Sequence, residues 1–162
     1  MKKKILVHMD YCTGCRSCSA ACAAEHADGV PRLELVQVAE DVRMPLICRH
    51  CDDPACVAAC PTEAMYRDDE GVVLRNNFSC IGCKSCVLAC PFGVLTQELD
   101  FHIVPKCDLC PDRRARGEDP ACVASCTSGA LRFVEVEEVS ADREVFLIGS
   151  RGLGRSPYVR RR

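Results

Sequence analysis

A cysteine motif that occurs four times constrains this chain more than any other feature. Every copy starts with C-x2-C and ends with C-x3-C. Only the middle gap differs, with two residues in motifs I and III, four in motif II and eleven in motif IV. The sixteen cysteines are Cys12, Cys15, Cys18 and Cys22 in motif I; Cys48, Cys51, Cys56 and Cys60 in motif II; Cys80, Cys83, Cys86 and Cys90 in motif III; and Cys107, Cys110, Cys122 and Cys126 in motif IV. Such a repeat indicates one structural unit that is used several times.

The spacing within the motifs predicts iron–sulfur clusters. The run from Cys80 to Pro91 has the pattern C-x2-C-x2-C-x3-C-P, in which three thiolates hold one [4Fe–4S] cluster and the fourth ligates the other cluster of a two-cluster ferredoxin. Motif II keeps its proline as Pro61, whereas Ala23 and Thr127 follow the last cysteines of motifs I and IV. At four thiolates per cluster, the sixteen cysteines predict four [4Fe–4S] clusters.

The same cysteines allow alternatives. A zinc-binding interaction module is one, because zinc accepts four cysteine ligands, although usually from two C-x2-C pairs. A disulfide scaffold would need an oxidising compartment and a secretory signal, but the opening "MKKKILVHMD" has only a short apolar run. An enzyme with chemistry at a cluster would need an incomplete motif, and no motif lacks a cysteine. With no Trp, five Phe and three Tyr, the core is thin, so we expect metal centres to contribute strongly to folding.

The order of the motifs predicts how their cysteines pair. Motifs II and III enclose a hairpin, 63–74, with its turn at 68–71, and both end in Cys-Pro, so we expect them to form one unit. Its clusters are assigned to Cys48, Cys51 and Cys56 with Cys90, and to Cys80, Cys83 and Cys86 with Cys60. Motifs I and IV then pair, with Cys12, Cys15 and Cys18 joined by Cys126, and Cys107, Cys110 and Cys122 joined by Cys22. Sequential pairing, I with II and III with IV, is the alternative.

The fold class expected from these patterns is α+β, with two ferredoxin-like 2[4Fe–4S] units, one inserted within the other, and short strands and short helices around the clusters. Strands at 5–9 and 131–136 are expected to pair as the ends of the outer unit, and strands at 33–38 and 99–104 flank the inner one. Each motif ends in a small-residue segment that suits one helical turn. The predicted domains are 1–40 plus 101–138 for the outer unit, 41–100 for the inner unit, and 139–162 for a C-terminal extension with a basic tail.

The four-motif order resembles a known family, the iron–sulfur electron-transfer subunits of molybdenum and tungsten oxidoreductases, such as formate dehydrogenase and dimethyl sulfoxide reductase. The fourth motif, "CDLCPDRRARGEDPACVASC", carries much of this resemblance, which covers 1–136. It implies the crossed pairing and an electron-transfer role with no substrate site. Thr127 departs from the family, which commonly has proline there. Compact members without a membrane helix resemble the subunit of bacterial tungsten aldehyde oxidoreductase complexes.

That resemblance implies specific partners. They are a tungsten or molybdenum pterin catalytic subunit, an FAD subunit, and further copies of this chain in a self-assembled chain of clusters. A ferredoxin subunit of a carbon monoxide dehydrogenase, hydrogenase or formate dehydrogenase system is the alternative. We expect no membrane segment, because no apolar run approaches about 18 residues, and no nucleic acid, because no basic-aromatic patch occurs. The reduced thiols predict a cytoplasmic location.

Charged residues near the motifs are candidates to tune the clusters. Arg16 and Lys84 lie inside motifs I and III, where a cation raises a cluster's potential, unless they are only solvated. His26 and His50 either adjust the reduction potentials of nearby clusters or have only a packing or surface role. The arginines in the long gap of motif IV face a partner or close over a cluster (Arg113, Arg114 and Arg116). The formal charge of −2 becomes about −10 with four oxidised clusters, so we expect partners with basic rims.

The C-terminal extension carries two further expectations. A strand is expected at 144–149, and the basic segment 150–162 is either a solvated terminus or a docking tail for an acidic or cofactor-bearing partner.

Overall fold

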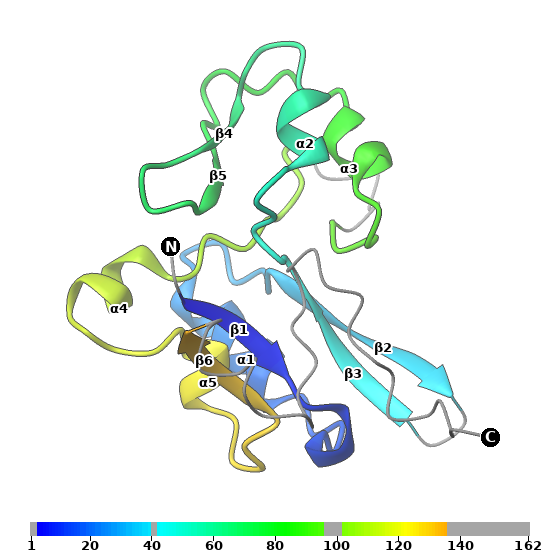
Figure 1. Ribbon diagram of the computed structural model, residues 1–162, viewed down its shortest axis with the longest axis vertical. Helices are drawn as coiled ribbons and strands as arrows, with labels where there is room; N and C mark the ends of the chain where they lie inside the picture. The colour runs from blue at the N-terminus through cyan, green and yellow to red at the C-terminus, as the bar shows by residue number, and fades with distance from the viewer. Residues whose placement is uncertain (1–2, 40–41, 96–101, 136–162) are drawn as a thin grey trace.

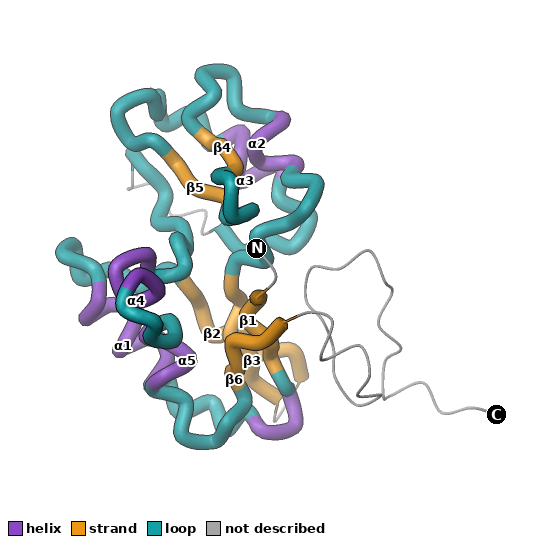
Figure 2. The backbone as a smooth tube through the Cα atoms, turned by 60° about the vertical axis from the view of Figure 1, so that its left-hand side comes forward, coloured by secondary structure: helices purple, strands orange, loops and turns teal. Residues whose placement is uncertain are grey.

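The computed structural model describes residues 3–39, 42–95 and 102–135, and these form two lobes (Figure 1). In chain order the elements are β1 (Lys3–Val7), the 3-10 helix η1 (Met9–Tyr11), α1 (Ser17–Glu25), β2 (Leu33–Ala39), β3 (Val42–Ile47), α2 (Ala55–Ala58), β4 (Met65–Arg67), β5 (Val73–Arg75), α3 (Ser85–Ala89), α4 (Pro111–Ala115), α5 (Ala121–Ala124) and β6 (Leu131–Glu135). One lobe holds α2, β4, β5 and α3, and the other holds the remaining elements, as Figure 2 also shows.

The two ends of the described chain pair as neighbouring strands. β1 and β6 are antiparallel, with Ile5 opposite Phe133 and Val7 opposite Leu131. Ile5, Val7 and Leu131 are buried, so the pairing is fixed by apolar side chains on its inner face. This confirms the predicted pairing of the first and last strands. β1 ends earlier than predicted because Met9 starts η1.

The hairpin predicted between motifs II and III is confirmed as β4 and β5. Asp68 closes its turn, because its carboxylate accepts a hydrogen bond from the Val72 N–H at 2.6 Å and its carbonyl accepts one from the Gly71 N–H at 2.9 Å. Gly71 has a φ of 83°, a left-handed conformation that glycine adopts without steric penalty. The turn delivers the fully buried Val72 and Val73 to the interior.

A second hairpin joins β2 to β3, with the buried side chains of Leu33 and Ile47 opposite each other. The strand predicted at 33–38 is therefore confirmed, although its partner β3 was not predicted. The hairpin crosses the predicted boundary between 40 and 41, and the domain division stays a prediction. Of the strand predicted at 99–104, the described part, 102–104, is not a strand. The predicted strand 144–149 and the basic segment 150–162 lie outside the described residues.

Cysteines take the place of large side chains in the core. The larger apolar cluster combines Ile5, Val7 and Leu33 with the buried thiols of motifs I and IV (Cys18, Cys22, Cys107 and Cys122). A smaller cluster lies in the other lobe around Val87 and Val94. The predicted mixture of short helices and strands is confirmed, and the nested arrangement is taken up as a proposal below. None of the helices in the described ranges is both long and apolar enough to span a bilayer.

Candidate metal centres

The loops of all four motifs have a left-handed residue at the same position. The residue before the second cysteine is left-handed each time, with φ of 68° at Gly14, 44° at His50, 71° at Gly82 and 62° at Leu109. A left-handed residue next to right-handed ones turns successive N–H groups to one side, an arrangement that binds anions, including iron–sulfur clusters. A non-glycine residue costs about 1–2 kcal/mol in this conformation. His50 and Leu109 therefore keep a conformation that the loop requires.

A second turn follows the last cysteine of three motifs. The N–H three residues later donates to that cysteine's carbonyl at 3.2–3.3 Å, and the donor is left-handed (Glu63 to Cys60, Gly93 to Cys90, Gly129 to Cys126). Thr127 thus lies in the same turn as Pro61 and Pro91, so the departure from proline leaves the turn intact. Motif I differs, because α1 continues beyond its last cysteine to Glu25.

One pocket brings together the four thiols that the sequence assigns to a single cluster. Its walls include Cys48, Cys51 and Cys56 from motif II and Cys90 from motif III, and we call it the motif II pocket. Burial raises the pKa of the Cys56 thiol to about 11, and the other three thiols add to this. The Arg49 guanidinium stacks on the Phe92 ring at 3.6 Å, which holds motif II against the segment that follows Cys90.

A second pocket brings together thiols from the two ends of the chain. Cys12, Cys15 and Cys18 of motif I line it together with Cys126 of motif IV, and we call it the motif I pocket. Burial raises the pKa of the Cys18 thiol to about 11, with contributions from the other three. Cys15 is exposed, and hydrogen bonds from Ser17 lower the pKa of its thiol to about 7.

The remaining eight thiols belong to the sets predicted for the other two clusters, and their pKa shifts identify some of their neighbours. Burial raises the pKa of the Cys122 thiol to about 12, and the neighbouring Cys22 and Cys110 raise it further. In the other lobe, hydrogen bonds from Ser85 lower the pKa of the exposed Cys83 thiol, and nearby Cys60 opposes this.

Cys107, Cys80 and Cys86 complete these two sets. Cys107 is buried, and burial raises the pKa of its thiol well above its usual range, with Cys48 and then Cys122 adding to the rise. Burial raises the pKa of Cys86, and Cys80 adds to it. No three His, Cys, Asp or Glu side chains in the described ranges form a group that could hold a single metal ion. Two of the four predicted sets therefore line a pocket each, and the crossed pairing and the ligand role of all sixteen cysteines stay predictions.

Electrostatic neighbours link the predicted sets. Cys18 of the motif I pocket raises the pKa of the Cys122 thiol, and Cys48 of the motif II pocket raises the pKa of the Cys107 thiol, in both cases by less than burial does. α2 and α3, which carry the last two sets, pack together. Only the two end sets contain an exposed cysteine, Cys15 at one end and Cys83 at the other.

Histidines and arginines near the thiols occupy defined positions. His50 is 2% exposed, its Nδ1 accepts a hydrogen bond from the Val73 N–H at 3.1 Å, and burial lowers its pKa, so its ring is neutral. The His26 ring contacts the Cys22 carbonyl at 2.7 Å and the Asp108 carboxylate at 3.4 Å. His26 and His50 therefore both pack against cysteine motifs.

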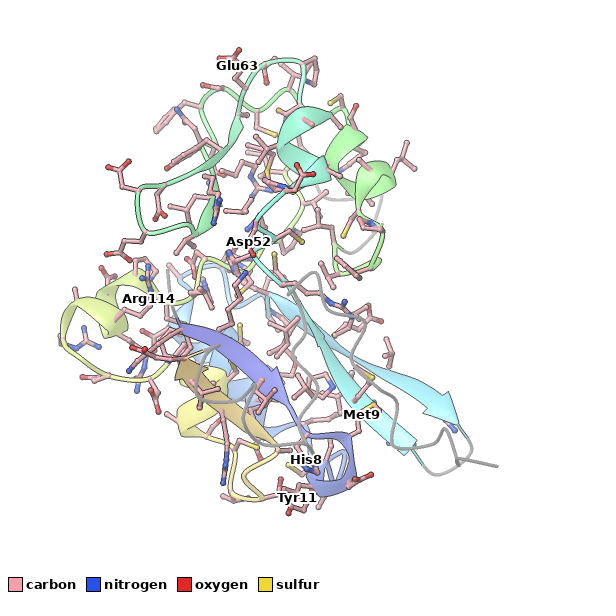
Figure 3. All side chains as sticks on the ribbon, in the orientation of Figure 1. His8, Met9, Tyr11, Asp52, Glu63 and Arg114 are labelled. Carbon is pink, nitrogen blue, oxygen red and sulfur yellow. The ribbon has the colours of Figure 1, made fainter. Side chains whose placement is uncertain are left out.

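The arginines of the motif IV gap bond within the chain. Arg114 pairs with Glu70, and Arg113 pairs with Glu25 at 3.6 Å (Figure 3 labels Arg114). Arg116 is largely exposed and pairs with Glu118 at 2.9 Å. Arg113 and Arg114 therefore hold the loop against α1 and the β4–β5 turn, and closure of the loop over a cluster stays a prediction. Arg16 and Lys84 share a left-handed conformation at the start of α1 and α3, and their effect on cluster potentials stays a prediction.

Two buried lysines were missed in the sequence. Lys4 and Lys106 are 8% and 7% exposed. Lys4 donates to the His50 carbonyl at 3.0 Å and pairs with Asp52 at 3.3 Å, where the chain passes between the lobes (Figure 3). Lys106 stands directly before a cysteine in an otherwise apolar stretch, and this was the available signal. Lysine is rarely buried without a partner, so both positions need a structural reason.

Comparison with known proteins gives consistent matches. Residues 40–136 match a family described as "4Fe-4S dicluster domain", and residues 9–25 match a "4Fe-4S binding domain". The chain is 36% identical to the thiosulfate reductase electron transfer subunit PhsB of Salmonella typhi, over 83% of this chain and 76% of that one. It is 34% identical to the B subunit of the anaerobic dimethyl sulfoxide reductase of Escherichia coli K12, over 79% of this chain and 71% of that one.

A third relative and one solved structure are also similar. An iron-sulfur protein of Rhodospirillum rubrum is 34% identical, with 85% of each chain covered. The active site complex BamBC of benzoyl coenzyme A reductase is 27% identical over 82% of this chain and 76% of that one, with a TM-score of 0.45.

Proposed function

We propose that this protein, which belongs to the family of [4Fe–4S] electron-transfer subunits of reductase complexes, conducts single electrons between a catalytic oxidoreductase subunit and a second redox partner. The relatives confirm two predictions in their general form. The chain is an electron-transfer subunit and not a catalytic one, and its cofactors are four [4Fe–4S] clusters. When bound, each cluster supplies a one-electron site.

The observation that carries the proposal is the composition of the two pockets. Each is lined by three cysteines of one motif and the last cysteine of another, in the crossed sets predicted from the sequence. The donor set fits a cluster, since four thiols surround one pocket. We therefore propose all sixteen cysteines as ligands in the crossed pairing, and the nested pair of ferredoxin-like units that follows from it.

The sequence of thiol sets gives the proposed electron path. Electrons enter or leave at the motif I pocket and at the set of motif III, where Cys15 and Cys83 are exposed. Between them the chain excludes water, because Cys107, Cys110 and Cys122 are buried. Ser17 and Ser85, which contact the two exposed thiols at 3.4 Å, are placed to donate hydrogen bonds to the end clusters.

The catalytic partner in this proposal carries a tungsten or molybdenum pterin. The resemblance of the compact chain supports a tungsten aldehyde oxidoreductase with an FAD subunit, and with self-association of this chain. Relatives named for thiosulfate and dimethyl sulfoxide reductases favour a second candidate, the electron-transfer subunit of a reductase for an oxidised sulfur compound. We place the protein in the cytoplasm, because none of the sixteen cysteines forms a disulfide and a reducing compartment keeps them available to bind clusters.

Anaerobic purification of the tagged chain from its own cells tests this proposal. We expect about sixteen iron atoms per chain, four clusters of four, and broad visible absorption that dithionite bleaches. A co-purifying pterin-containing subunit identified by mass spectrometry would name the partner and decide between the two candidates. A colourless protein with stoichiometric zinc would refute the iron–sulfur assignment.

A further inference from the structure

A buried lysine lies between the two middle thiol sets. The Lys106 side chain lines the motif II pocket, and its ammonium donates to the carbonyl of Cys107, the first cysteine of motif IV, at 2.8 Å. We infer that Lys106 is a positioning residue that joins the two middle cluster sites and raises the reduction potential of both clusters. The inference rests on the proposed function, and it adds a residue that no cysteine pattern assigns.

A continuous network runs through Lys106 and connects the two motifs. Lys106 donates to the Val73 carbonyl, and the Val73 N–H donates to the His50 ring at 3.1 Å. The His50 carbonyl in turn accepts from Lys4 on β1 at 3.0 Å. The network therefore ties β1, motif II, β5 and the start of motif IV together, so the ammonium fixes the spacing of two sites that belong to different lobes.

The charge of Lys106 has no carboxylate to balance it. Among the ion pairs of the described residues none involves Lys106, whereas the equally buried Lys4 pairs with Asp52 at 3.3 Å. Moving an unpaired ammonium out of water is strongly unfavourable. Two of its three N–H groups bond to carbonyls, which satisfies donors but leaves the positive charge. A nearby anion would therefore stabilise the buried Lys106 ammonium.

Thiolate-ligated clusters on both sides supply that anion. A [4Fe–4S] core with four thiolates is negatively charged in its oxidised state and gains one more negative charge on reduction. A fixed ammonium therefore stabilises the reduced form more than the oxidised form.

Redox titration of the holoprotein, followed by EPR, tests the inference. Lys106→Gln removes the charge but keeps N–H donors for the carbonyls, and Lys106→Arg keeps the charge. Lys3→Met is the matched control, because it removes one cation from an exposed position on β1. Iron content and the circular dichroism spectrum are measured on every variant.

In Lys106→Gln we expect the reduced-to-oxidised ratio of two clusters to fall about tenfold at fixed potential, which corresponds to about 59 mV for a one-electron couple. In the same variant, the other two clusters should keep the wild-type potentials. In Lys106→Arg and in Lys3→Met, all four clusters should keep them. Loss of iron confined to two clusters in Lys106→Gln, with Lys106→Arg fully loaded, also supports the inference. Unchanged potentials, an equal shift of all four clusters, or loss of all iron would overturn it. A wild-type chain without four clusters would instead refute the proposed function.

Discussion

Replacing Cys90 with serine tests the exchange of ligands between motifs II and III. Cys90 caps the end of α3, and its side chain lines the pocket of Cys48, Cys51 and Cys56 instead of serving its own motif. Serine removes one of four thiolates from the proposed motif II cluster and leaves the three others of motif III in place. We therefore expect the iron content to fall from about sixteen to about twelve atoms per chain.

Thiol alkylation identifies which cluster is lost. A coordinated thiolate is not available to an alkylating reagent, so cysteines of an intact cluster stay unmodified. After brief anaerobic alkylation of the Cys90→Ser holoprotein, peptide mass spectrometry should find modification at Cys48, Cys51 and Cys56. Cys83 is exposed in the structure, and its protection would show that the motif III cluster is intact.

Cys86→Ser is the matched control, because Cys86 lies in the same motif, on the helix whose end Cys90 caps. It should release Cys60, Cys80 and Cys83 and leave the motif II thiols protected. The same iron loss with the opposite alkylation pattern would establish the exchange. Modification of Cys80, Cys83 and Cys86 in the Cys90→Ser protein would refute the crossed pairing and favour a self-contained motif III.

Three further predictions follow from the structure. Gly82→Ala should destabilise the holoprotein more than Gly93→Ala in thermal unfolding. Both positions are left-handed, which costs alanine about 1–2 kcal/mol, but only at Gly82 would the new Cβ also lie 2.8 Å from the His102 carbonyl oxygen. Equal losses of stability would contradict this. Anaerobic removal of iron should abolish cooperative unfolding in far-UV circular dichroism, because buried thiols form part of the core, and an apoprotein that unfolds like the holoprotein would contradict it. Asp52→Ala should lower the free energy of unfolding by at most about 1 kcal/mol, because Asp52 is half exposed and forms ion pairs with Lys4 and Arg67. Denaturant titration checks this, with Asp53→Ala at an exposed position as the control. Equal effects of the two substitutions would show that the ion pairs contribute nothing to stability.

Local signals in the sequence were enough to predict the elements next to the motifs. The hairpin of β4 and β5 follows from Asp68 and Gly71, which favour a tight turn whatever surrounds them. The helical turns within the motifs follow from small residues between cysteines, and all four occur as parts of α1, α2, α3 and α5. These features depend on neighbours in the sequence, so a single chain reveals them.

Features that depend on distant contacts could not be predicted. β3 contains Pro45, which lacks an N–H and argues against a strand, but the two-stranded hairpin leaves an edge where proline is tolerated. Lys106 stands before a cysteine in an apolar stretch, but its burial between β5 and motif IV depends on contacts that the sequence does not show. His50 was considered for its proximity to cysteines, whereas its left-handed backbone and its bond to Val73 emerge only in three dimensions.

Buried lysines offer a physical account of how a small chain holds so much negative charge. Four oxidised clusters add about −8 to the formal charge of −2. The only charged side chains classed as buried among the described residues are Lys4 and Lys106, and no carboxylate is among them. Interior charges act through a lower effective dielectric than surface charges and are screened less by salt. The two lysines should therefore influence the middle clusters more than Arg16 influences an end cluster from its exposed position. The carboxylates of the described residues are all at least partly exposed, where a partner with a basic rim would meet them.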